Sequence, residues 1–565
     1  MLQFNTAPSW YWLGVFFLFI GVVWLSVRWR TNNRLLFGLG LGLLVLMRLP
    51  LLLVNIELNP DESQLLSQAL TLLYHPVYWK SVDGATMGPL SCYFAAIPGH
   101  LGLPLTYSSL RVMALLCLVV SMVSTYFSIE NFFGGRVAQL ALVPSLAFFA
   151  FTTQIDYVHA TNEQLSLALI GLATWQYSRM WARQTFTSVG NLFWLGFVSS
   201  LVPFAKLQGT PTVLVLVVFA FIGLIRQYSQ TNSVEFWRAL AGLFMGGLLF
   251  PALVVGLTLY FGVFIDLIQF YIIGNFAYSN EGGFAQSMVH FPTFLSKTTD
   301  FAGFLLPTAG LVVAWSLWSR SFRSQGGLLK LILALLVASG YAVIKPGNEF
   351  THYLLYLILP ITLLNAWLIA NLPASMTASI GAAACWILLV LLPSSFKIPW
   401  HINLLRHQPV DGNRIERYAR IPLRLSSTAQ AVLKLAQPGE DLVVWGWAPR
   451  YNVETQMPQG VSDNHTIRCV MGTDSSQRIH RARYLRNIQA SRPPVFLDAV
   501  GPNSTWLNDR SAYGYENFPE LKQFIDQHYQ YVGDIAHTRL YARLDRLKSL
   551  PLTSDTHVDQ KRTHL

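Results

Sequence analysis

The stretch LLFGLGLGLLVLMRLPLLLVNIELNPDES, residues 35–63, joins a long apolar run to two adjacent carboxylates. The run from Leu35 to Val54 is close to the roughly 20 residues that an α-helix needs to cross a bilayer. Asp61 and Glu62 follow it and open an amphipathic segment, SQLLSQALTLLYH. Ionised carboxylates at a membrane boundary are costly unless water, a partner or a reaction compensates them. The pair therefore indicates either a helix N-terminus, with Asn59 or Asp61 as its cap, or a reaction site.

The composition is that of a polytopic α-helical membrane protein. Of the 565 residues, 53% are hydrophobic and 12% are charged, whereas soluble domains carry roughly 25% charged residues. The net charge of +11 requires no nucleic-acid partner, because basic loops on the cytoplasmic side of a membrane account for it. The first apolar run, Trp10–Val27, has no positive charge before it, which favours a retained helix over a cleaved signal peptide.

Twelve membrane spans are predicted, at residues 10–27, 35–54, 107–128, 136–153, 163–180, 189–205, 209–225, 239–263, 301–318, 328–344, 352–371 and 375–393. One set of connecting segments carries Arg28, Arg30, Arg34, Arg136, Arg179, Arg183, Arg226, Arg238, Arg320, Arg323 and Lys330. The other set carries only Lys80, Arg111, Lys206, Lys297 and Lys345. The positive-inside rule places the first set in the cytoplasm, so both termini and the Asp61–Glu62 loop are expected to face outward.

The predicted domain organisation follows from a change in composition near Pro393. Residues 1–396 form the membrane domain, with long outer loops at 55–106 and 264–300. Residues 397–550 alternate helical and strand patterns and predict a soluble α/β domain outside the cytoplasmic (inner) membrane, on its periplasmic or extracellular side. The strands are expected in DLVVWGWAP, PVFLDAV and TRLYARL, and the helices in IPLRLSSTAQAVLKLAQ and FPELKQFIDQHY. Residues 551–565 read as a disordered tail.

Polar groups gather in four segments of the predicted outer face: Asp61 and Glu62; Asp156, His159 and Glu163; Lys206; and Lys345, Glu349, His352 and Tyr353. Each segment also has a structural explanation. His159 and Glu163 can cap a helix, Lys206 can extend to the membrane interface, and His352 with Tyr353 can belong to an interfacial aromatic belt. Arg48 lies inside the second span, where a charge can either pair with an acid or serve a function.

Together these groups indicate a type of reaction that no single one of them indicates. Carboxylates suit the removal of a proton from a hydroxyl group. Lysine, histidine and tyrosine suit the binding of a phosphate leaving group. Both kinds lie on one face, beside an apolar helix bundle that can hold a lipid tail, which indicates group transfer from a lipid-linked phosphate.

Five stretches within residues 48–360 resemble the GT-C glycosyltransferases, in particular the protein-O-mannosyltransferases and aminoarabinose transferases of families 39 and 83. They are LNPDESQLLSQALTLL, DGATMGPLSCYFAAIPGHLGLPLTYSSLRVMALL, HATNEQLSLALI, PFAKLQGTP and THYLLYLILP. The C-terminal region resembles the soluble domain that follows the membrane region in many bacterial members. The resemblance implies a GT-C-like membrane domain and inverting transfer of a sugar from a polyprenyl-phosphate donor to a hydroxyl of a lipid, glycan or protein.

The resemblance also implies roles for individual residues. Asp61 takes the place of the family's catalytic aspartate, and Glu62 is its companion acid. Lys206 and the pair His352–Tyr353 fall where the family places groups near the donor phosphate. The full set of candidate donor-phosphate and substrate residues is Arg48, Lys80, Asp156, His159, Glu163, Lys206, Lys345, His352 and Tyr353.

One departure from the family pattern concerns the first outer loop. Many relatives have Lys-Pro-Pro where this chain has Met87-Gly88-Pro89. The phosphate contact credited to that lysine would then need a substitute, and Lys80 or Arg48 are the candidates.

Metal use and two rival functions stay open at the level of sequence. Some relatives bind a divalent ion, for which Asp61, Asp156, His159 and Glu163 are the candidate ligands, although we expect catalysis that requires no cofactor. One rival is a twelve-span transporter or a lipid flippase of envelope precursors, against which the absence of an internal repeat argues. The other is a non-catalytic envelope assembly protein that uses the α/β domain for binding.

Overall fold

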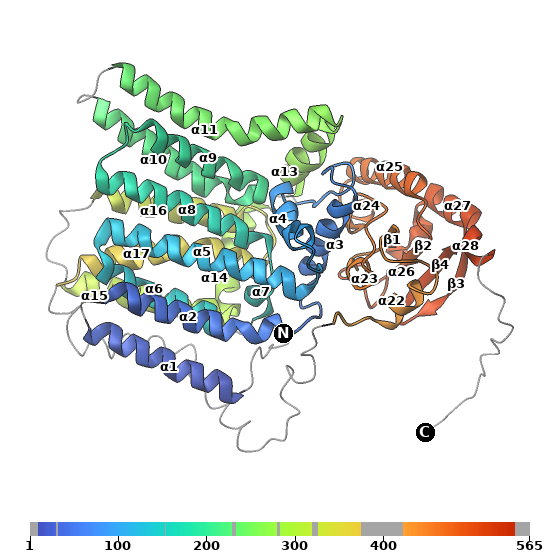
Figure 1. The fold of residues 1–565 in the computed structure, drawn as a ribbon, viewed down its shortest axis with the longest axis horizontal. Coiled ribbons are helices and arrows are strands. Elements are labelled where there is room, and N and C mark those ends of the chain that lie inside the picture. Colours follow the sequence, from blue (N-terminus) through green and yellow to red (C-terminus); the bar gives the residue numbers. More distant parts are fainter. Residues whose placement is uncertain are drawn as a thin grey trace. The chain divides into compact units, whose positions relative to one another are not determined.

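A computed structural model describes residues 9–29, 32–152, 154–228, 233–278, 283–318, 326–373 and 422–548 (Figure 1). The described residues separate into two compact units that divide between Arg424 and Leu425. The twelfth predicted span at 375–393, the predicted domain boundary after residue 396 and the predicted tail at 551–565 lie outside the described residues.

The first unit is helical. Its α-helices are α1 Ser9–Arg28, α2 Asn33–Leu52, α3 Pro60–Tyr74, α4 Pro89–His100, α5 Tyr107–Phe133, α6 Gly135–Phe151, α7 Ile155–Val158, α8 Asn162–Arg183, α9 Val189–Ala205, α10 Thr210–Tyr228, α11 Ser233–Tyr260, α12 Phe264–Asp266, α13 Gly274–Tyr278, α14 Phe284–Lys297, α15 Thr299–Trp318, α16 Gly326–Ile344 and α17 Ile358–Ala370. Short segments of other helical types are the 3₁₀ turns η1 Leu207–Gly209 and η3 Thr351–Leu357 and the π-helical η2 Leu267–Ile273.

Eight helices of the described part are long and apolar enough to cross a membrane: Ser9–Arg28, Asn33–Leu52, Tyr107–Phe133, Leu207–Tyr228, Ser233–Tyr260, Thr299–Leu317, Gly326–Ile344 and Thr351–Ala370. The chain is thus a polytopic helical membrane protein, as its composition predicts. The number of twelve spans stays a prediction, since α6 and α9 are shorter apolar helices and α8 is not among the eight.

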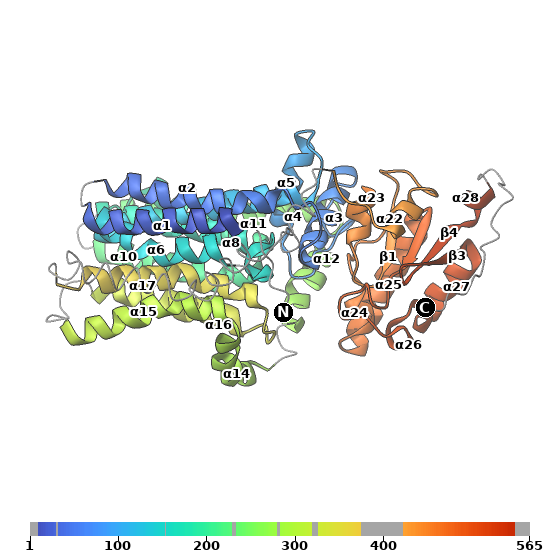
Figure 2. The ribbon, with the colours of Figure 1, turned by 90° about the horizontal axis from the view of Figure 1, so that it is seen from below.

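The spanning helices lie side by side, and α3 and α4 gather at one end of the bundle (Figures 1 and 2). Small residues permit close contact between neighbouring helices, as between α9 and α11. A Cβ atom on Gly246 would lie 2.0 Å from the carbonyl oxygen of Phe193, so only glycine fits at this crossing.

The segment 55–106, predicted as an outer loop, contains α3 and α4, which pack against each other. Most of the apolar segment Leu90–Leu103 lies in α4. The loop is docked on the end of α9, because Gly88 N and Ser91 Oγ both donate to the carbonyl of Ala205, at 3.0 and 2.9 Å. A Cβ atom on Gly88 would lie 2.0 Å from the carbonyl oxygen of Phe204. Glycine at position 88 therefore allows the loop to reach the residue before Lys206.

The second unit is a small α/β domain. Its elements are α22 Ser427–Val432, β1 Leu442–Trp445, α23 Arg450–Thr455, α24 Ile467–Val470, α25 Asp474–Ser491, β2 Val495–Asp498, α26 Arg510–Tyr513, η4 Tyr515–Asn517, α27 Pro519–His528, β3 Tyr529–Ile535, β4 Thr538–Arg543 and α28 Leu544–Lys548. The four strands pair in the order β1-β2-β4-β3. β1 and β2 are parallel, which requires a crossover connection, and α25 lies in it. β4 runs antiparallel to both of its neighbours.

The predicted strands in this domain and the helix α27 are confirmed. The helix predicted in IPLRLSSTAQAVLKLAQ is shorter in the described residues, where α22 spans only Ser427–Val432. β3 and α25 were not predicted from the sequence. β3 is an edge strand with mostly exposed or half-exposed residues, and α25 has few buried apolar residues, so neither has a strong hydrophobic pattern.

Candidate active site

Asp61 lies in the first turn of α3, and Asn59 is the residue that caps this helix. The Asn59 side chain accepts a hydrogen bond from Asp61 N at 3.0 Å. The Asp61 carboxylate is 23% exposed, and its Oδ2 lies 3.9 Å from Nε2 of His352. Of the two capping residues that the sequence allows, Asn59 is therefore the observed one, and the Asp61 carboxylate is directed at another segment of the chain.

Glu62 has the opposite environment. Its side chain is fully buried and accepts hydrogen bonds from Nε and Nη2 of Arg111 at 2.8 and 2.6 Å. The backbone amides of Leu58 and Ala160 donate to the same carboxylate at 3.1 and 2.9 Å. Burial raises the pKa of Glu62, but the Arg111 guanidinium and the hydrogen bonds outweigh it, so the pKa lies below its usual value. Glu62 is an ionised group whose acceptor sites are occupied by the protein.

Arg111 extends this arrangement to the end of α2. Its guanidinium also donates to the carbonyl groups of Val54 and Ile56, in the segment that joins α2 to α3. The Glu62–Arg111 pair thus ties together the connection before Asp61, the start of α5 and the residue after His159. From the sequence, Arg111 was interpreted only as a loop charge. A single arginine within an otherwise apolar predicted span was the signal that could have identified it.

Lys206 and Glu163 form a second buried ion pair near Asp61. Their side chains are 5% and 1% exposed, and the Lys206 ammonium bonds Oε1 of Glu163. Nε2 of His352 lies 3.7 Å from the same oxygen. The ring of Tyr353 completes the group, because the Lys206 ammonium lies 4.8 Å from its centroid, within cation–π distance. Lys206 does not extend to the membrane interface, and His352 and Tyr353 are buried rather than part of an aromatic belt.

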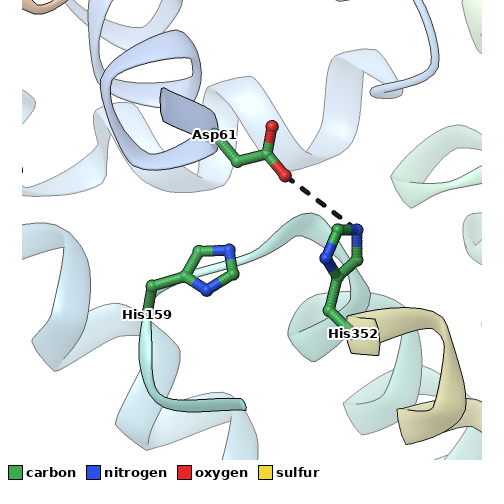
Figure 3. A group of neighbouring side chains, drawn as sticks. All are labelled: Asp61, His159 and His352. Carbon is green, nitrogen blue, oxygen red and sulfur yellow. Dashed lines mark ion pairs between the residues drawn. The ribbon is translucent and has the colours of Figure 1, made fainter. Parts of the chain in front are cut away.

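His159 faces His352, with ring centroids 5.8 Å apart. Its Nδ1 bonds the Ile155 carbonyl at 2.8 Å. His159 Nε2 and His352 Nδ1 are buried and have no hydrogen-bond partner among the described residues. One ligand atom from each of Asp61, His159 and His352 lies within 4.8 Å of the others, so these three side chains could hold a metal ion (Figure 3). Of the ligand set predicted from the sequence, the structure places Asp61 and His159 in this group.

The remaining predicted residues lie in other surroundings. Asp156 accepts a hydrogen bond from Asn59 Nδ2 at 3.3 Å, beside the start of α3. Lys80 is exposed in the turn after α3, and Lys345 is partly exposed after α16. Arg48 is buried in α2, where its Nη2 donates to the Tyr157 carbonyl at 3.2 Å.

We call the residues that the structure brings together the outer cluster, after the face of the membrane predicted from the sequence: Asp61, His159, Glu163, Lys206, His352 and Tyr353. They come from α3, the segment before α8, the start of α8, the end of α9 and η3. A carboxylate that is partly accessible lies in it beside a lysine and two histidines. This arrangement has a group that can accept a proton and groups that can neutralise an anion.

No protein-family model matches the chain, and no curated protein matches it. Solved structures do. The crystal structure of ArnT from Cupriavidus metallidurans bound to undecaprenyl phosphate matches with a TM-score of 0.54 and 12% identity, over 89% of this chain and 97% of that chain. The apo structure of the same protein matches with a TM-score of 0.48 and 13% identity, over 94% and 98% of the two chains.

A third match is the Archaeoglobus fulgidus oligosaccharyltransferase in complex with Zn and sulfate, with a TM-score of 0.40 and 12% identity, over 82% of this chain and 68% of that chain. ArnT, an aminoarabinose transferase, and the oligosaccharyltransferase are both GT-C glycosyltransferases. The match to the ArnT complex covers both the helical membrane region and the C-terminal domain of this chain. The chain has the GT-C fold.

Proposed function

We propose that the protein is a membrane glycosyltransferase that moves a sugar from a polyprenyl-phosphate donor to a hydroxyl acceptor, with inversion at the anomeric carbon. The observation that carries the proposal is the outer cluster. It unites a partly exposed carboxylate with a buried lysine and two histidines from segments far apart in the sequence. The fold of ArnT, solved with undecaprenyl phosphate, supports a donor of this class.

In this proposal Asp61 is the general base. Its carboxylate accepts the proton of the acceptor hydroxyl while the oxygen attacks the anomeric carbon from the side opposite the phosphate. The bond between the anomeric carbon and the phosphate oxygen breaks, and its electron pair leaves with polyprenyl phosphate. Asp61 is suited to this role because its side chain is 23% exposed, whereas the adjacent Glu62 is buried and paired with Arg111.

Lys206 is the principal group for the donor phosphate. A charge-assisted hydrogen bond from its ammonium stabilises the negative charge that develops on the leaving group. Glu163 and the ring of Tyr353 hold the ammonium in place. His352 lies between Asp61 and Glu163 and can donate to the phosphate or orient Asp61. Glu62 and Arg111 act by positioning Asp61.

The residues present also fit a divalent metal ion, since His159 Nε2 and His352 Nδ1 are buried without partners among the described residues and lie near Asp61. Asp61, His159 and His352 would hold it, and it would supply positive charge to the donor phosphate. The proposed proton transfer by Asp61 and phosphate binding by Lys206 do not require the ion.

We place the reaction on the outer face of the cytoplasmic membrane, with the C-terminal α/β domain on the same side. The support is the distribution of Lys and Arg between the two sets of loops. The sugar is then transferred where the polyprenyl chain can lie in the outer leaflet beside the helix bundle.

The test is transfer by the purified full-length protein from a panel of synthetic polyprenyl-phosphate sugars to acceptors extracted from the membrane. The proposal expects release of polyprenyl phosphate together with a glycosylated acceptor.

Lys206→Ala should raise the donor concentration needed for half-maximal rate by about 10- to 100-fold, because it removes a charge-assisted hydrogen bond. Lys80→Ala is the matched control, since Lys80 lies outside the outer cluster. Movement of lipid without any transfer product would instead favour the transporter or flippase.

A further inference from the structure

Arg48 is a buried cation that the proposed transfer does not use. It is 6% exposed, and among the described residues its only hydrogen bond is the one from Nη2 to the Tyr157 carbonyl, at 3.2 Å. Its Nε is buried and has no partner in the part of the chain that the structure describes. Because a guanidinium stays protonated, this arginine presents a positive charge that no acidic side chain of the described residues balances.

A cavity opens at this charge. The atom-free space there is about 560 Å³, a figure that includes open space outside its mouth. Leu52 of α2 and Ala114, Leu115 and Leu118 of α5 line it and are partly exposed, so the cavity opens between these two helices. Its walls are otherwise mostly apolar. Arg111 also lines it, but the Arg111 charge is balanced by Glu62. Arg48 is therefore the group that would attract a ligand.

The depth of the cavity indicates what kind of ligand fits. Arg48 lies four residues before the end of α2, which is about 6 Å along the helix axis at a rise of 1.5 Å per residue. Arg111 lies in the second turn of α5, close to the same end of the bundle. Both α2 and α5 are membrane-spanning helices with apolar exposed faces. A ligand that places a negative charge near a helix end and an apolar chain along such helices is a lipid with a phosphate head group.

The cavity is distinct from the outer cluster. Asp61, Glu163 and Lys206 do not line it. The two share a wall, because Tyr157 and Val158 line the cavity and His159 follows them in the chain. We propose that the cavity binds the phosphate head of a membrane lipid on Arg48, with the lipid chain leaving between α2 and α5. This second lipid site goes beyond the proposed function, since lipid can bind there whether or not a sugar is transferred.

The test measures lipid binding by the full-length protein after removal of co-purified lipid. The probes are phosphatidylglycerol, an undecaprenyl phosphate and, as the phosphate-free control, diacylglycerol. Arg48→Gln keeps a donor for the Tyr157 carbonyl but removes the charge. It should weaken binding of the phosphate-bearing lipid by about 10- to 100-fold and leave diacylglycerol binding unchanged.

A second pair of variants tests the cavity without changing a charge. Ala114→Phe fills the mouth and should also weaken the binding. Val112→Phe is the matched control on the same helix, since Val112 is 41% exposed and does not line the cavity. If Arg48→Gln lowers the melting temperature, the comparison of lipid binding by Ala114→Phe and Val112→Phe decides whether the cavity binds the lipid.

The comparison of the lipid probes identifies which lipid supplies the phosphate group. A loss for phosphatidylglycerol identifies a phospholipid site, and a loss for undecaprenyl phosphate alone identifies a second site for the carrier lipid. Either result supports the proposal if the Lys206→Ala variant still binds the lipid whose binding Arg48→Gln weakens. Unchanged binding of both lipids by Arg48→Gln and Ala114→Phe would overturn it, and so would loss of all phosphate-lipid binding in Lys206→Ala alone.

Discussion

Asp61 and Glu62 are neighbours in the chain, but the protein uses their charges in different ways. The Asp61 carboxylate is partly exposed and faces His352, whereas Glu62 is enclosed by Arg111 and two backbone amides. A carboxylate whose acceptor sites are already occupied is poorly suited to take a proton from a substrate. We therefore expect Glu62 to determine where Asp61 lies, and Asp61 to meet the substrate.

Glu62→Gln should destabilise the protein, because it leaves the Arg111 charge buried without its counter-ion. Removal of one member of a buried ion pair costs about 3–5 kcal/mol of folding free energy. Thermal unfolding of the purified protein in detergent measures the effect. Glu130→Gln is the matched control. It removes a carboxylate from the pair with Arg34, whose side chain is 72% exposed, and should change the melting temperature little. Equal melting temperatures for the two variants would contradict the anchoring role of Glu62.

At the residue scale, the sequence indicated candidate side chains for the chemistry but not how they pair. Carboxylates, lysine and histidine at the ends of apolar runs are conspicuous because charge is costly there. Their partners lie far away along the chain: Arg111 is 49 residues from Glu62, and Lys206 is 43 residues from Glu163. Such contacts depend on how the helices pack, which no local pattern encodes. For the same reason the sequence grouped Arg48 and Lys345 with residues that the structure places elsewhere.

At the scale of elements, the loop between α2 and α5 is held by its contact with the end of α9. Gly88 makes this contact through the hydrogen bond from its amide to the Ala205 carbonyl. The outcome is that Lys206, the residue after Ala205, is fixed in the outer cluster by the same loop that carries Asp61.

Gly88→Ala should reduce transfer activity by about 100-fold, because the added Cβ would lie 2.0 Å from the Phe204 carbonyl and displace the loop from α9. Single-turnover rates with saturating donor measure the loss. Gly190→Ala is the control within α9 itself, since a Cβ there meets nothing within 4 Å. Wild-type rates in the Gly88 variant would show that the contact does not position the site.

The element scale also shows where hydrophobic patterns succeed and where they fail. Long apolar runs with few charges identify spans, so α2, α5 and α11 were predicted as spans. α8 was predicted as a span too, but the polar and charged residues Glu163, Gln176 and Arg179 make it less apolar than the eight helices. In the C-terminal unit the buried strands β1 and β2 were evident, while the exposed edge strand β3 was not.

Asp498, at the end of β2, gives this unit a dependence on pH. Burial raises its pKa to about 6, in spite of Arg510 nearby, against 3.8 for the ordinary residue. The folded state thus binds the proton more tightly than the unfolded state. The stabilisation is complete below about pH 4 and is lost as the pH rises through about 6, with up to about 3 kcal/mol for a shift of this size.

Hydrogen exchange of β2 amides in the full-length protein, measured between pH 4 and 7 and corrected for intrinsic exchange, tests this prediction. Asp498→Asn should remove most of the pH dependence. Asp526→Asn, which alters a carboxylate that is 53% exposed, should keep it. A pH dependence that survives in Asp498→Asn would assign the effect to another group.

At the scale of the whole molecule, the distribution of Lys and Arg predicts which ends of the helices face the cytoplasm. We expect the C-terminal α/β domain to lie outside. A cysteine introduced at the exposed position Gln523 on α27 should react with an impermeant reagent in intact cells or spheroplasts. Ala182→Cys, at the predicted cytoplasmic end of α8, should react only after lysis. The reverse labelling pattern would show the opposite orientation and would contradict the placement of the reaction on the outer face.

The most direct measurement of the central claim is the rate of the chemical step in Asp61→Asn. Asparagine has the same shape, and helix α3 keeps its cap because Asn59 supplies it. Asparagine cannot accept the proton of the acceptor hydroxyl. The account predicts a folded protein that binds the polyprenyl-phosphate donor with unchanged affinity and transfers the sugar about 10²- to 10⁴-fold more slowly in a single turnover. A single-turnover rate close to that of the unaltered protein, with chemistry limiting, would contradict it.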